Sequence, residues 1–260
     1  MLRKFACLVL MFALLLPCGF DASAQQQKKL TQFSTIDALM SGIYDGTLTM
    51  AELTRYGDFG LGTFQSLDGE MAVVDGIVYQ ITSDGAVHTP DAAMTTPFAA
   101  VTFFAPDREI ELKSGATFES LAGEVDPLLP TRNIFYAVRI EGLFDKVKTR
   151  VVPKQCKPYP PLTEVVKTQS TFDFEKVEGV MVGWRCPSFV KGINFPGYHL
   201  HFLTKDRKAG GHVLEFTAGQ ATVKIDGVSD FRVILPESKD FFGLNLEGGA
   251  AASYDAVEKK

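Results

Sequence analysis

The chain is poor in the residues that most often build metal clusters or cross-link small folds. It has four cysteines, four histidines and one tryptophan in 260 residues. Two cysteines fall within the first 20 residues, and the other two, Cys156 and Cys186, are 30 residues apart. This spacing is not that of a CxxC motif and argues against a cysteine-rich metal site. In an oxidising compartment the pair can form one disulfide or remain two small buried residues, and spacing alone does not decide between these.

The chain also lacks an excess of positive charge and any long apolar run beyond its N-terminus. Its formal net charge is −5, which argues against a general affinity for nucleic acid or for anionic membranes. Arg3-Lys4, an apolar run over residues 5–16 and the small residues Ala22-Ser23-Ala24 form the pattern of a cleaved leader. The run is shorter than the ~20 residues that span a bilayer. We therefore predict a signal peptide over residues 1–24, cleavage near Ala24, and secretion to the periplasm or the medium.

Short helices and β-rich stretches make up the remainder. Residues 34–44 have apolar residues at helical spacing after a capping Ser34 or Thr35. Residues 49–56 begin with Thr49 followed three residues later by a glutamate, the spacing of a capping box. Further on, the pattern predicts a hairpin around Asp75-Gly76, strands over 98–104, 133–141 and 147–152, and helices over 118–121 and 162–168.

These elements predict an α+β fold of two sheet-based halves, with mixed or antiparallel sheets and few helices. The proline-rich stretch 157–161 is expected to link the halves. We therefore assign residues 25–155 to an N-terminal sheet domain and residues 156–260 to a C-terminal sheet domain that binds metal. Residues 177–181 echo residues 67–71, which suggests an internal duplication.

The strongest local signal is a cluster of histidines. Three of the four in the chain, His199, His201 and His212, fall within fourteen residues. Alternate residues of a strand share a face, so the first two imidazoles should project together. The polar stretch 204–211 reads as a hairpin loop that returns His212 opposite or diagonal to His201. Three imidazoles arranged in this way can hold a metal ion with positions left open, which is typical of catalytic zinc.

Two alternatives compete with this interpretation. An exposed strand can carry two histidines without a metal, but a third at hairpin distance in a histidine-poor chain favours a metal site. Cupins also use His-x-His, but they add a glutamate where Lys205 and Asp206 stand here. The fourth histidine, His88, stands alone and is expected in a loop or on the surface.

The residues around the histidines resemble those of the bacterial alpha-acetolactate decarboxylase family. The strings NFPGYHLHF at 194–202 and DRKAGGHVL at 206–214 carry the resemblance most specifically. It extends upstream through GLGTF at 60–64 and LDGE at 67–70, and through VKTR at 147–150. It covers about residues 33–258, which is nearly the whole chain beyond the predicted leader.

The resemblance implies a zinc enzyme of two sheet-containing halves, usually a homodimer, that converts 2-acetolactate to (R)-acetoin and carbon dioxide. It implies metal ligands at His199, His201 and His212, a catalytic arginine at Arg150 and an active-site glutamate at Glu70. A threonine near the site matches Thr63. A glutamate that the C-terminal tail returns to the site matches Glu258, with Glu247 as the competing candidate.

The proposed chemistry explains why these residue types are needed. When a β-keto acid loses carbon dioxide, its ketone takes up the electron pair, and a metal stabilises the resulting enediolate. Arg150 can orient the departing carboxylate, unless it simply belongs to the solvated strand face of Lys146 and Lys148. Glu70, held protonated in a shielded site, can donate the proton to carbon, unless it is an ordinary turn glutamate. Glu258 is then expected to tune or cover the metal.

Two other function classes remain open from the residues alone. A secreted zinc hydrolase would use the same three histidines to activate a hydroxide. A non-catalytic metal-binding or sugar-binding β module would show no turnover at all. The histidines also do not fix the metal, because imidazole sites accept iron, copper or nickel as well as zinc.

Overall fold

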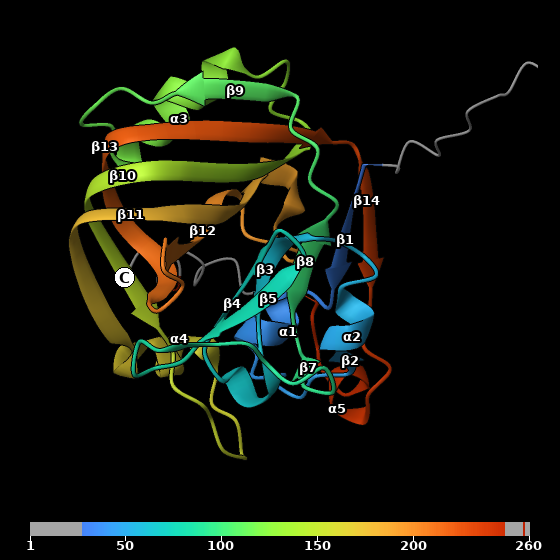
Figure 1. Cartoon of the computed structure of the whole chain (residues 1–260). Coiled ribbons are helices and arrows are strands. Elements are labelled where there is room, and N and C mark those ends of the chain that lie inside the picture. The colour runs from blue at the N-terminus through green and yellow to red at the C-terminus, as the bar shows by residue number, and fades with distance from the viewer. Residues whose placement is uncertain (1–27, 248–256, 258–260) are drawn as a thin grey trace, which may run out of the picture.

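The computed structural model describes residues 28–247 and residue 257, and consists of two large β-sheets with a few short helices (Figure 1). The predicted leader over 1–24 and Glu258 lie outside the described residues. Among the described residues, no helix has the length and apolar character that crossing a membrane requires. The strands are β1 (Lys29–Phe33), β2 (Leu48–Thr49), β3 (Phe59–Thr63), β4 (Glu70–Val74), β5 (Ile77–Ile81), β6 (Val87–His88), β7 (Thr95–Thr96), β8 (Ala99–Thr102), β9 (Arg108–Glu111), β10 (Phe135–Val151), β11 (Ser170–Cys186), β12 (Gly197–Thr204), β13 (Gly210–Val228) and β14 (Asp230–Ile234). The helices are α1 (Ile36–Met40), α2 (Met50–Leu53), α3 (Phe118–Val125), α4 (Leu162–Val165) and α5 (Lys239–Phe242), with 3₁₀ turns η1 (Gln65–Leu67), η2 (Asp126–Leu128), η3 (Val166–Thr168) and η4 (Ser188–Val190).

The first sheet has seven strands in the order β14-β1-β8-β3-β4-β5-β6. Only β1 and β14 pair in parallel; the other neighbours are antiparallel. The predicted hairpin around Asp75-Gly76 is confirmed as the β4–β5 connection. Both turn residues have positive φ, 52° and 79°, which matches the twist of a two-residue hairpin.

The second sheet is built on three strands of 17 to 19 residues, β10, β11 and β13. From β9 it runs through β13, β10 and β11 to β12, as the upper half of Figure 1 shows. Strand β12 then pairs with the start of β13, so the sheet closes on itself at one end. The histidines lie at this closure.

The two strands predicted over 133–141 and 147–152 are one strand, β10, and the prediction of a break between them is wrong. The chain bends at Gly142, whose φ is +147°, and register shifts against β13 follow between Leu143 and Lys146. An added Cβ at Gly142 would lie 2.2 Å from the Gln220 carbonyl oxygen, so only glycine permits this bend beside β13. Glycine and bulges thus curve a long strand without ending it.

The short helices begin where their caps predict. Thr35 accepts a hydrogen bond from the Ala38 amide at the start of α1. Thr49 and Glu52 form the expected capping box of α2. The first helix is shorter than its predicted range, because the chain turns after Ser41 through Gly42, which has φ +93°.

Each sheet draws strands from both sides of the boundary expected at residues 155–156. Strands β9 and β10 join the second sheet, and β14 returns to pair with β1 of the first. The assignment of separate domains to 25–155 and 156–260 stays a prediction. The internal duplication is not confirmed: residues 67–70 form a turn into β4, whereas residues 177–181 lie inside β11.

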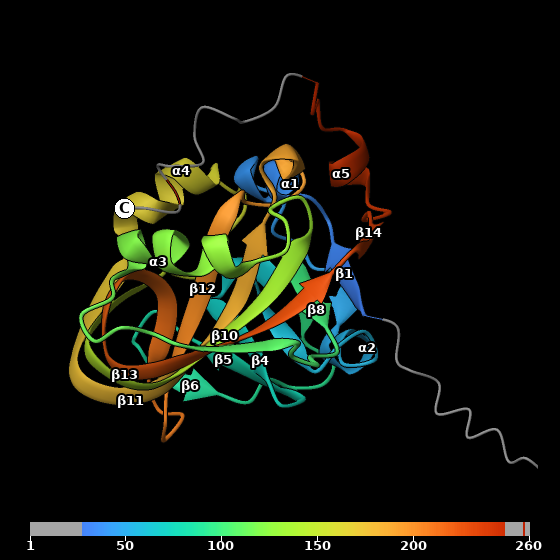
Figure 2. The ribbon, with the colours of Figure 1, turned by 90° about the horizontal axis from the view of Figure 1, so that it is seen from above.

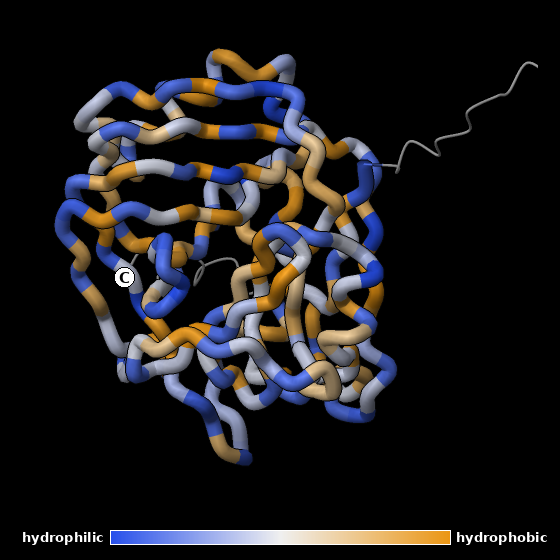
Figure 3. Tube along the Cα trace, viewed as in Figure 1, coloured by the Kyte–Doolittle hydropathy of each residue, from blue (hydrophilic) through white to orange (hydrophobic). Residues whose placement is uncertain are grey.

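One hydrophobic core lies between the two sheets and takes residues from both. Alternating hydrophobic and hydrophilic residues along the long strands direct one face inward (Figure 3). Trp184 of β11 is 1% exposed, and its indole N–H donates to the Ala100 carbonyl of β8 at 3.0 Å. On the other side, α3 packs Leu121 and Val125 into the hollow of the bent second sheet, which it flanks in Figure 2. The first sheet's other face packs against α2.

Truncation of the tryptophan should therefore loosen the contact between the sheets. We expect Trp184→Ala to lower the free energy of unfolding by about 3–5 kcal/mol, through the lost burial and the cavity that remains. Urea unfolding followed by far-ultraviolet circular dichroism measures this, since the chain has no other tryptophan. Phe242→Ala, at a ring that is 70% exposed, is the control and should stay within about 0.5 kcal/mol of wild type. A cost below about 1 kcal/mol for Trp184→Ala would contradict this role.

Candidate metal centre and active site

The three clustered histidines converge as the sequence predicts. In the β12–β13 pairing His201 lies directly opposite His212, and His199 shares the face of His201 two residues earlier. The ligand atoms of the three rings all lie within 4.8 Å of one another. Their exposed fractions are 7% for His199 and 1% for each of the others. Leu200 and Phe202, on the opposite face of β12, enter the core of the second sheet.

Two of the three separations between the ring nitrogens match those around a tetrahedral metal ion. Nε2 of His199 lies 3.2 Å from Nε2 of His201 and 3.1 Å from Nδ1 of His212. Nitrogens bound to one zinc at about 2.0–2.1 Å are separated by about 3.3 Å at the tetrahedral angle. Three protein ligands of this kind leave one position for a substrate or water. The three histidines can therefore hold a metal ion, and their geometry does not distinguish zinc from other imidazole-binding metals.

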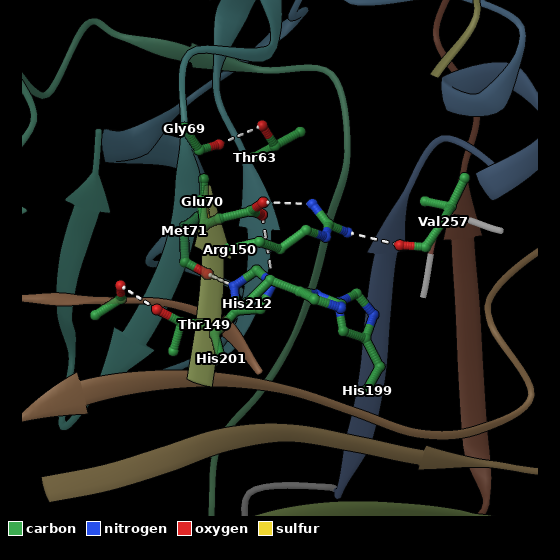
Figure 4. Close-up of polar contacts among 11 residues, drawn as sticks. Thr63, Gly69, Glu70, Met71, Thr149, Arg150, His199, His201, His212 and Val257 are labelled. Carbon is green, nitrogen blue, oxygen red and sulfur yellow. Dashed lines mark hydrogen bonds and ion pairs between the residues drawn. The ribbon is translucent and has the colours of Figure 1, made fainter. Parts of the chain in front are cut away.

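A backbone carbonyl fixes how His201 meets the metal. Its Nδ1 lies 2.7 Å from the Met71 carbonyl oxygen, which can only accept a hydrogen bond. The proton is therefore on Nδ1, and Nε2 keeps its lone pair toward the other two rings. Because Met71 belongs to β4, this bond also connects the second sheet to the first (Figure 4).

Burial keeps the imidazoles in the form that binds metal. Desolvation, and then the repulsion that a protonated His201 and Arg150 would exert, lower the pKa of His199 well below its usual range. Desolvation also lowers the pKa of His201, although the Glu70 carboxylate and the Met71 carbonyl act in the opposite direction. Neutral imidazoles carry the lone pairs that a cation needs, so no proton has to leave these two rings before a metal binds near neutral pH.

Glu70 and Arg150 form a buried ion pair beside the histidines. Arg150 Nη1 donates to Glu70 Oε1 at 2.9 Å, and the two side chains are 6% and 8% exposed. The other oxygen, Oε2, lies 3.5 Å from His201 Nε2. Figure 4 shows the carboxylate between the guanidinium and the imidazoles. The residues that were expected to act together therefore share one site.

The second guanidinium nitrogen of Arg150 ties the C-terminal tail to the site. Nη2 donates to the Val257 carbonyl oxygen at 3.1 Å, and Val257 is buried. Nε is buried and has no hydrogen-bond partner among the described residues. Glu258 follows Val257 directly but lies outside the described residues. The competing candidate, Glu247, is exposed and does not line the pocket.

Arg150 does not belong to a solvated strand face. It shares the side of β10 that carries Lys146 and Lys148, whose side chains are 48% and 33% exposed and approach Glu215. Toward the end of the strand, however, Glu70 of the first sheet covers this face. Along this face of β10, Lys146 and Lys148 are therefore partly exposed to solvent, whereas Arg150 is buried in the site.

Thr63 lies at the site without offering its hydroxyl proton to a ligand. It is 4% exposed and lines the pocket, but its Oγ1 donates to the Gly69 carbonyl at 2.7 Å. Gly69 immediately precedes Glu70, so this bond fixes the turn from which Glu70 projects (Figure 4). Thr63 therefore positions the glutamate in this structure.

The remaining wall of the pocket is apolar. The hydrophobic residues that line it come from seven segments of the chain. They are Ile36, Leu39, Leu67, Phe98, Val152, Leu162, Phe195 and Val257. An apolar, water-poor wall strengthens every charge interaction inside the pocket.

Several of these groups gave no signal in the sequence. The Met71 and Val257 carbonyls are backbone atoms that any residue would supply, so no pattern could have identified them. Phe195 packs its ring edge-on against His199, at 5.4 Å between centroids. Phe195 belongs to the string NFPGYHLHF, but its side chain has no polar group that would indicate a place at the metal site.

The remaining predictions concern His88 and the two cysteines beyond the predicted leader. His88 is exposed, as expected. Cys156 is exposed and Cys186 is buried, and no disulfide joins the two.

Comparison with known proteins gives matches along nearly the whole described chain. A family model described as alpha-acetolactate decarboxylase matches residues 30–248. The alpha-acetolactate decarboxylase of Methanosarcina mazei is 46% identical over 239 residues, which cover 92% of this chain and 83% of that protein. The Methylococcus capsulatus protein of the same name is 44% identical over 227 residues, or 87% of each chain. The crystal structure of alpha-acetolactate decarboxylase from Bacillus subtilis superposes with a TM-score of 0.87 at 41% identity, covering 89% of this chain and all of that one.

Removal of any one of the three histidines should abolish tight metal binding. We expect the purified protein to bind one divalent metal ion per chain. His199→Ala, His201→Ala and His212→Ala should each weaken binding by more than the 10- to 100-fold typical of changes to a ligand's outer hydrogen-bond partners. Equilibrium titration with zinc and a competing chelator measures the affinity. His88→Ala is the matched control, and a comparable loss there, or none in the triad, would contradict the site.

Proposed function

Because this chain belongs to the alpha-acetolactate decarboxylase family, we propose that it removes carbon dioxide from 2-acetolactate and releases (R)-acetoin, with zinc held by His199, His201 and His212. The observation that carries the proposal is the buried contact between Arg150 and Glu70 directly beside the three imidazoles. This arrangement offers Arg150 to the substrate carboxylate and Glu70 to the proton transfer. The metal position lies where negative charge develops during the reaction.

Arg150 binds and orients the substrate carboxylate. Its Nε–H is buried without a partner among the described residues, so a donor is open on a cation that is already desolvated. Guanidinium groups engage carboxylates through two parallel hydrogen bonds, which fixes orientation as well as charge. The apolar wall excludes water from the methyl groups of the substrate and from the carbon that will lose its carboxylate.

The reaction breaks the bond between that carbon and the carboxylate, and the electron pair moves toward the neighbouring ketone oxygen. When bound, zinc supplies Lewis-acid stabilisation of this negative charge. His199 and His201 are neutral, so they hold the cation without reducing its charge. Carbon dioxide leaves as a neutral molecule, and the carbon then takes up one proton to give acetoin.

Glu70 is the proposed route of that proton: its carboxylate, which is ionised while it pairs with Arg150, takes up a proton from water when the substrate carboxylate engages the guanidinium, and passes that proton to carbon. Its carboxyl lies between Arg150 and His201, within reach of any substrate that contacts both the guanidinium and the metal position. Thr63 holds the preceding turn through Gly69, so the carboxyl approaches from one direction. Delivery from a single direction gives one enantiomer of acetoin. Glu258 is proposed to tune or cover the metal from the tail.

A zinc hydrolase would use the same three histidines, but family membership and the Arg150–Glu70 pair favour decarboxylation. A hydrolase has no need of a buried guanidinium for a carboxylate that departs as carbon dioxide. A non-catalytic binding module has no need of a desolvated ion pair, which costs free energy to bury.

The proposal also covers the export of the protein and its oligomeric state. We propose that residues 1–24 are a signal peptide cleaved near Ala24, and that the mature protein acts as a homodimer outside the cytoplasm. Both statements rest on the sequence pattern and the family resemblance.

Acetolactate turnover tests the function directly. Purified protein should release carbon dioxide and acetoin from 2-acetolactate, and a strong chelator should abolish turnover, because the developing charge then has no cation to stabilise it. Added zinc should restore activity. Acetoin is measured colorimetrically, and acyl or phosphoryl ester substrates serve as the hydrolase control. Ester cleavage without acetoin formation would overturn the proposal.

Replacement of Glu70 by its amide should slow the reaction and leave the metal in place. We expect Glu70→Gln to lower kcat by about 10²-fold or more, the usual effect of losing a positioned acid. Glu247→Gln, at an exposed carboxyl that does not line the pocket, should keep wild-type turnover. Near-normal kcat in Glu70→Gln would remove this residue from proton transfer.

Loss of the guanidinium should remove turnover without removing the metal. We expect Arg150→Ala to lower kcat/KM by about 10²-fold or more, as expected for a lost transition-state contact to a carboxylate, while bound zinc stays near one per chain. Lys148→Ala, on the same strand face but partly exposed, is the matched control. A metal-free Arg150→Ala protein would show instead that the arginine maintains the structure of the site.

A further inference from the structure

The turn that precedes Glu70 has an unusual backbone. Ser66 and Leu67, both in the 3₁₀ turn η1, have φ values of 62° and 56°. L-residues other than glycine, asparagine and aspartate rarely adopt this left-handed region, and two in succession are rarer still. Backbone strain of this kind persists only where surrounding contacts hold it, and it concentrates at functional sites.

Contacts from four other segments hold this turn. The Ser66 amide donates to the Tyr44 carbonyl at 2.8 Å, and the Ser66 carbonyl accepts from the Gln155 amide at 2.7 Å. The Ser66 hydroxyl lies 2.9 Å from the Tyr159 hydroxyl, which itself donates to Asp45.

Two further bonds hold the end of the turn. The Gln80 side chain donates to the Asp68 carbonyl at 2.8 Å, and Thr63 donates to that of Gly69. The turn is therefore fixed from both sides.

The effect of this arrangement is to direct Leu67 into the pocket. Leu67 is 2% exposed and lines the pocket together with the three histidines, Glu70 and Arg150. Among the described residues that line it, Leu67 is the one with a positive φ. The other apolar lining residues come from helices, strands or backbone with negative φ. The backbone strain in the pocket wall is therefore located at Leu67, three positions before Glu70.

We propose that Leu67 is a specificity-determining residue that limits the length of the alkyl groups on the substrate. The inference rests on the proposed function. The chemical class is that of 2-alkyl-2-hydroxy-3-keto acids with short alkyl chains, and the rigid turn prevents the wall from yielding to a longer one. A leucine in an ordinary, adaptable loop would not discriminate in this way, because it could move aside at little cost.

The test compares kcat/KM for 2-acetolactate with that for its 2-ethyl and 2-propyl homologues. Leu67→Ala removes three carbon atoms from the wall, so the ratio of propyl to methyl activity should rise at least about tenfold over wild type. Each methylene in a shaped apolar pocket discriminates by about 10- to 200-fold. Leu67→Gly should shift the ratio in the same direction and folds readily at this φ, since glycine has no Cβ to strain.

The matched control is Leu53→Ala. Leu53 is fully buried on α2, belongs to the cluster on the other face of the first sheet and does not line the pocket. It should lose stability as Leu67→Ala does, with an unchanged substrate ratio. An unchanged ratio in both Leu67 variants that keep their zinc, or an equal shift in Leu53→Ala, would overturn the proposal. Failure of the wild-type protein to convert 2-acetolactate itself would instead overturn the proposed function.

Discussion

The hydrogen bond from His201 Nδ1 to the Met71 carbonyl is the contact on which the rest of the site depends. It sets which nitrogen of the central histidine faces the metal position, and it does so with a backbone atom of the first sheet. The neighbouring residue on the same strand is Glu70, so the bond that orients the imidazole also brings the carboxylate to it. The closure of β12 onto β13 supplies the other two rings. Metal ligands from one sheet and a carboxylate from the other thus meet without any long flexible connection.

Burial of these charged groups strengthens their interactions with a reacting substrate, and it also lowers the stability of the fold. Arg150 and Glu70 face each other out of water, and a buried ion pair is weak grounds for stability because desolvation offsets much of the attraction. The same low dielectric strengthens every interaction with a developing charge. The surrounding core, with Leu67 and Phe195 in the wall, stabilises the fold that holds these groups together. The molecule therefore retains charged side chains where apolar ones would pack at lower cost, which is typical of a site kept for chemistry.

Local chemistry made much of this structure predictable from the sequence. The period-two spacing of His199 and His201 predicts their common face, and Asp75-Gly76 predicts the hairpin, because both depend on neighbours along the chain. The capping box at Thr49 is local for the same reason. The single long strand β10 was not predicted, since the bend at Gly142 depends on a partner strand about 80 residues away. The return of β14 to β1, and the carbonyls of Met71 and Val257, depend on tertiary pairing or on backbone atoms that carry no sequence signal. Glu70 and Arg150 could be named from the family resemblance, but their contact could be seen only in the structure.

The geometry of metal coordination tests the account most directly. Crystals of the zinc-loaded protein, measured on both sides of the zinc absorption edge, should give one anomalous peak per chain. We expect that peak at about 2.0–2.1 Å from Nε2 of His199, Nε2 of His201 and Nδ1 of His212, with the His201–Met71 hydrogen bond intact. A zinc peak elsewhere, or coordination of His201 through Nδ1 with loss of that bond, would contradict the account.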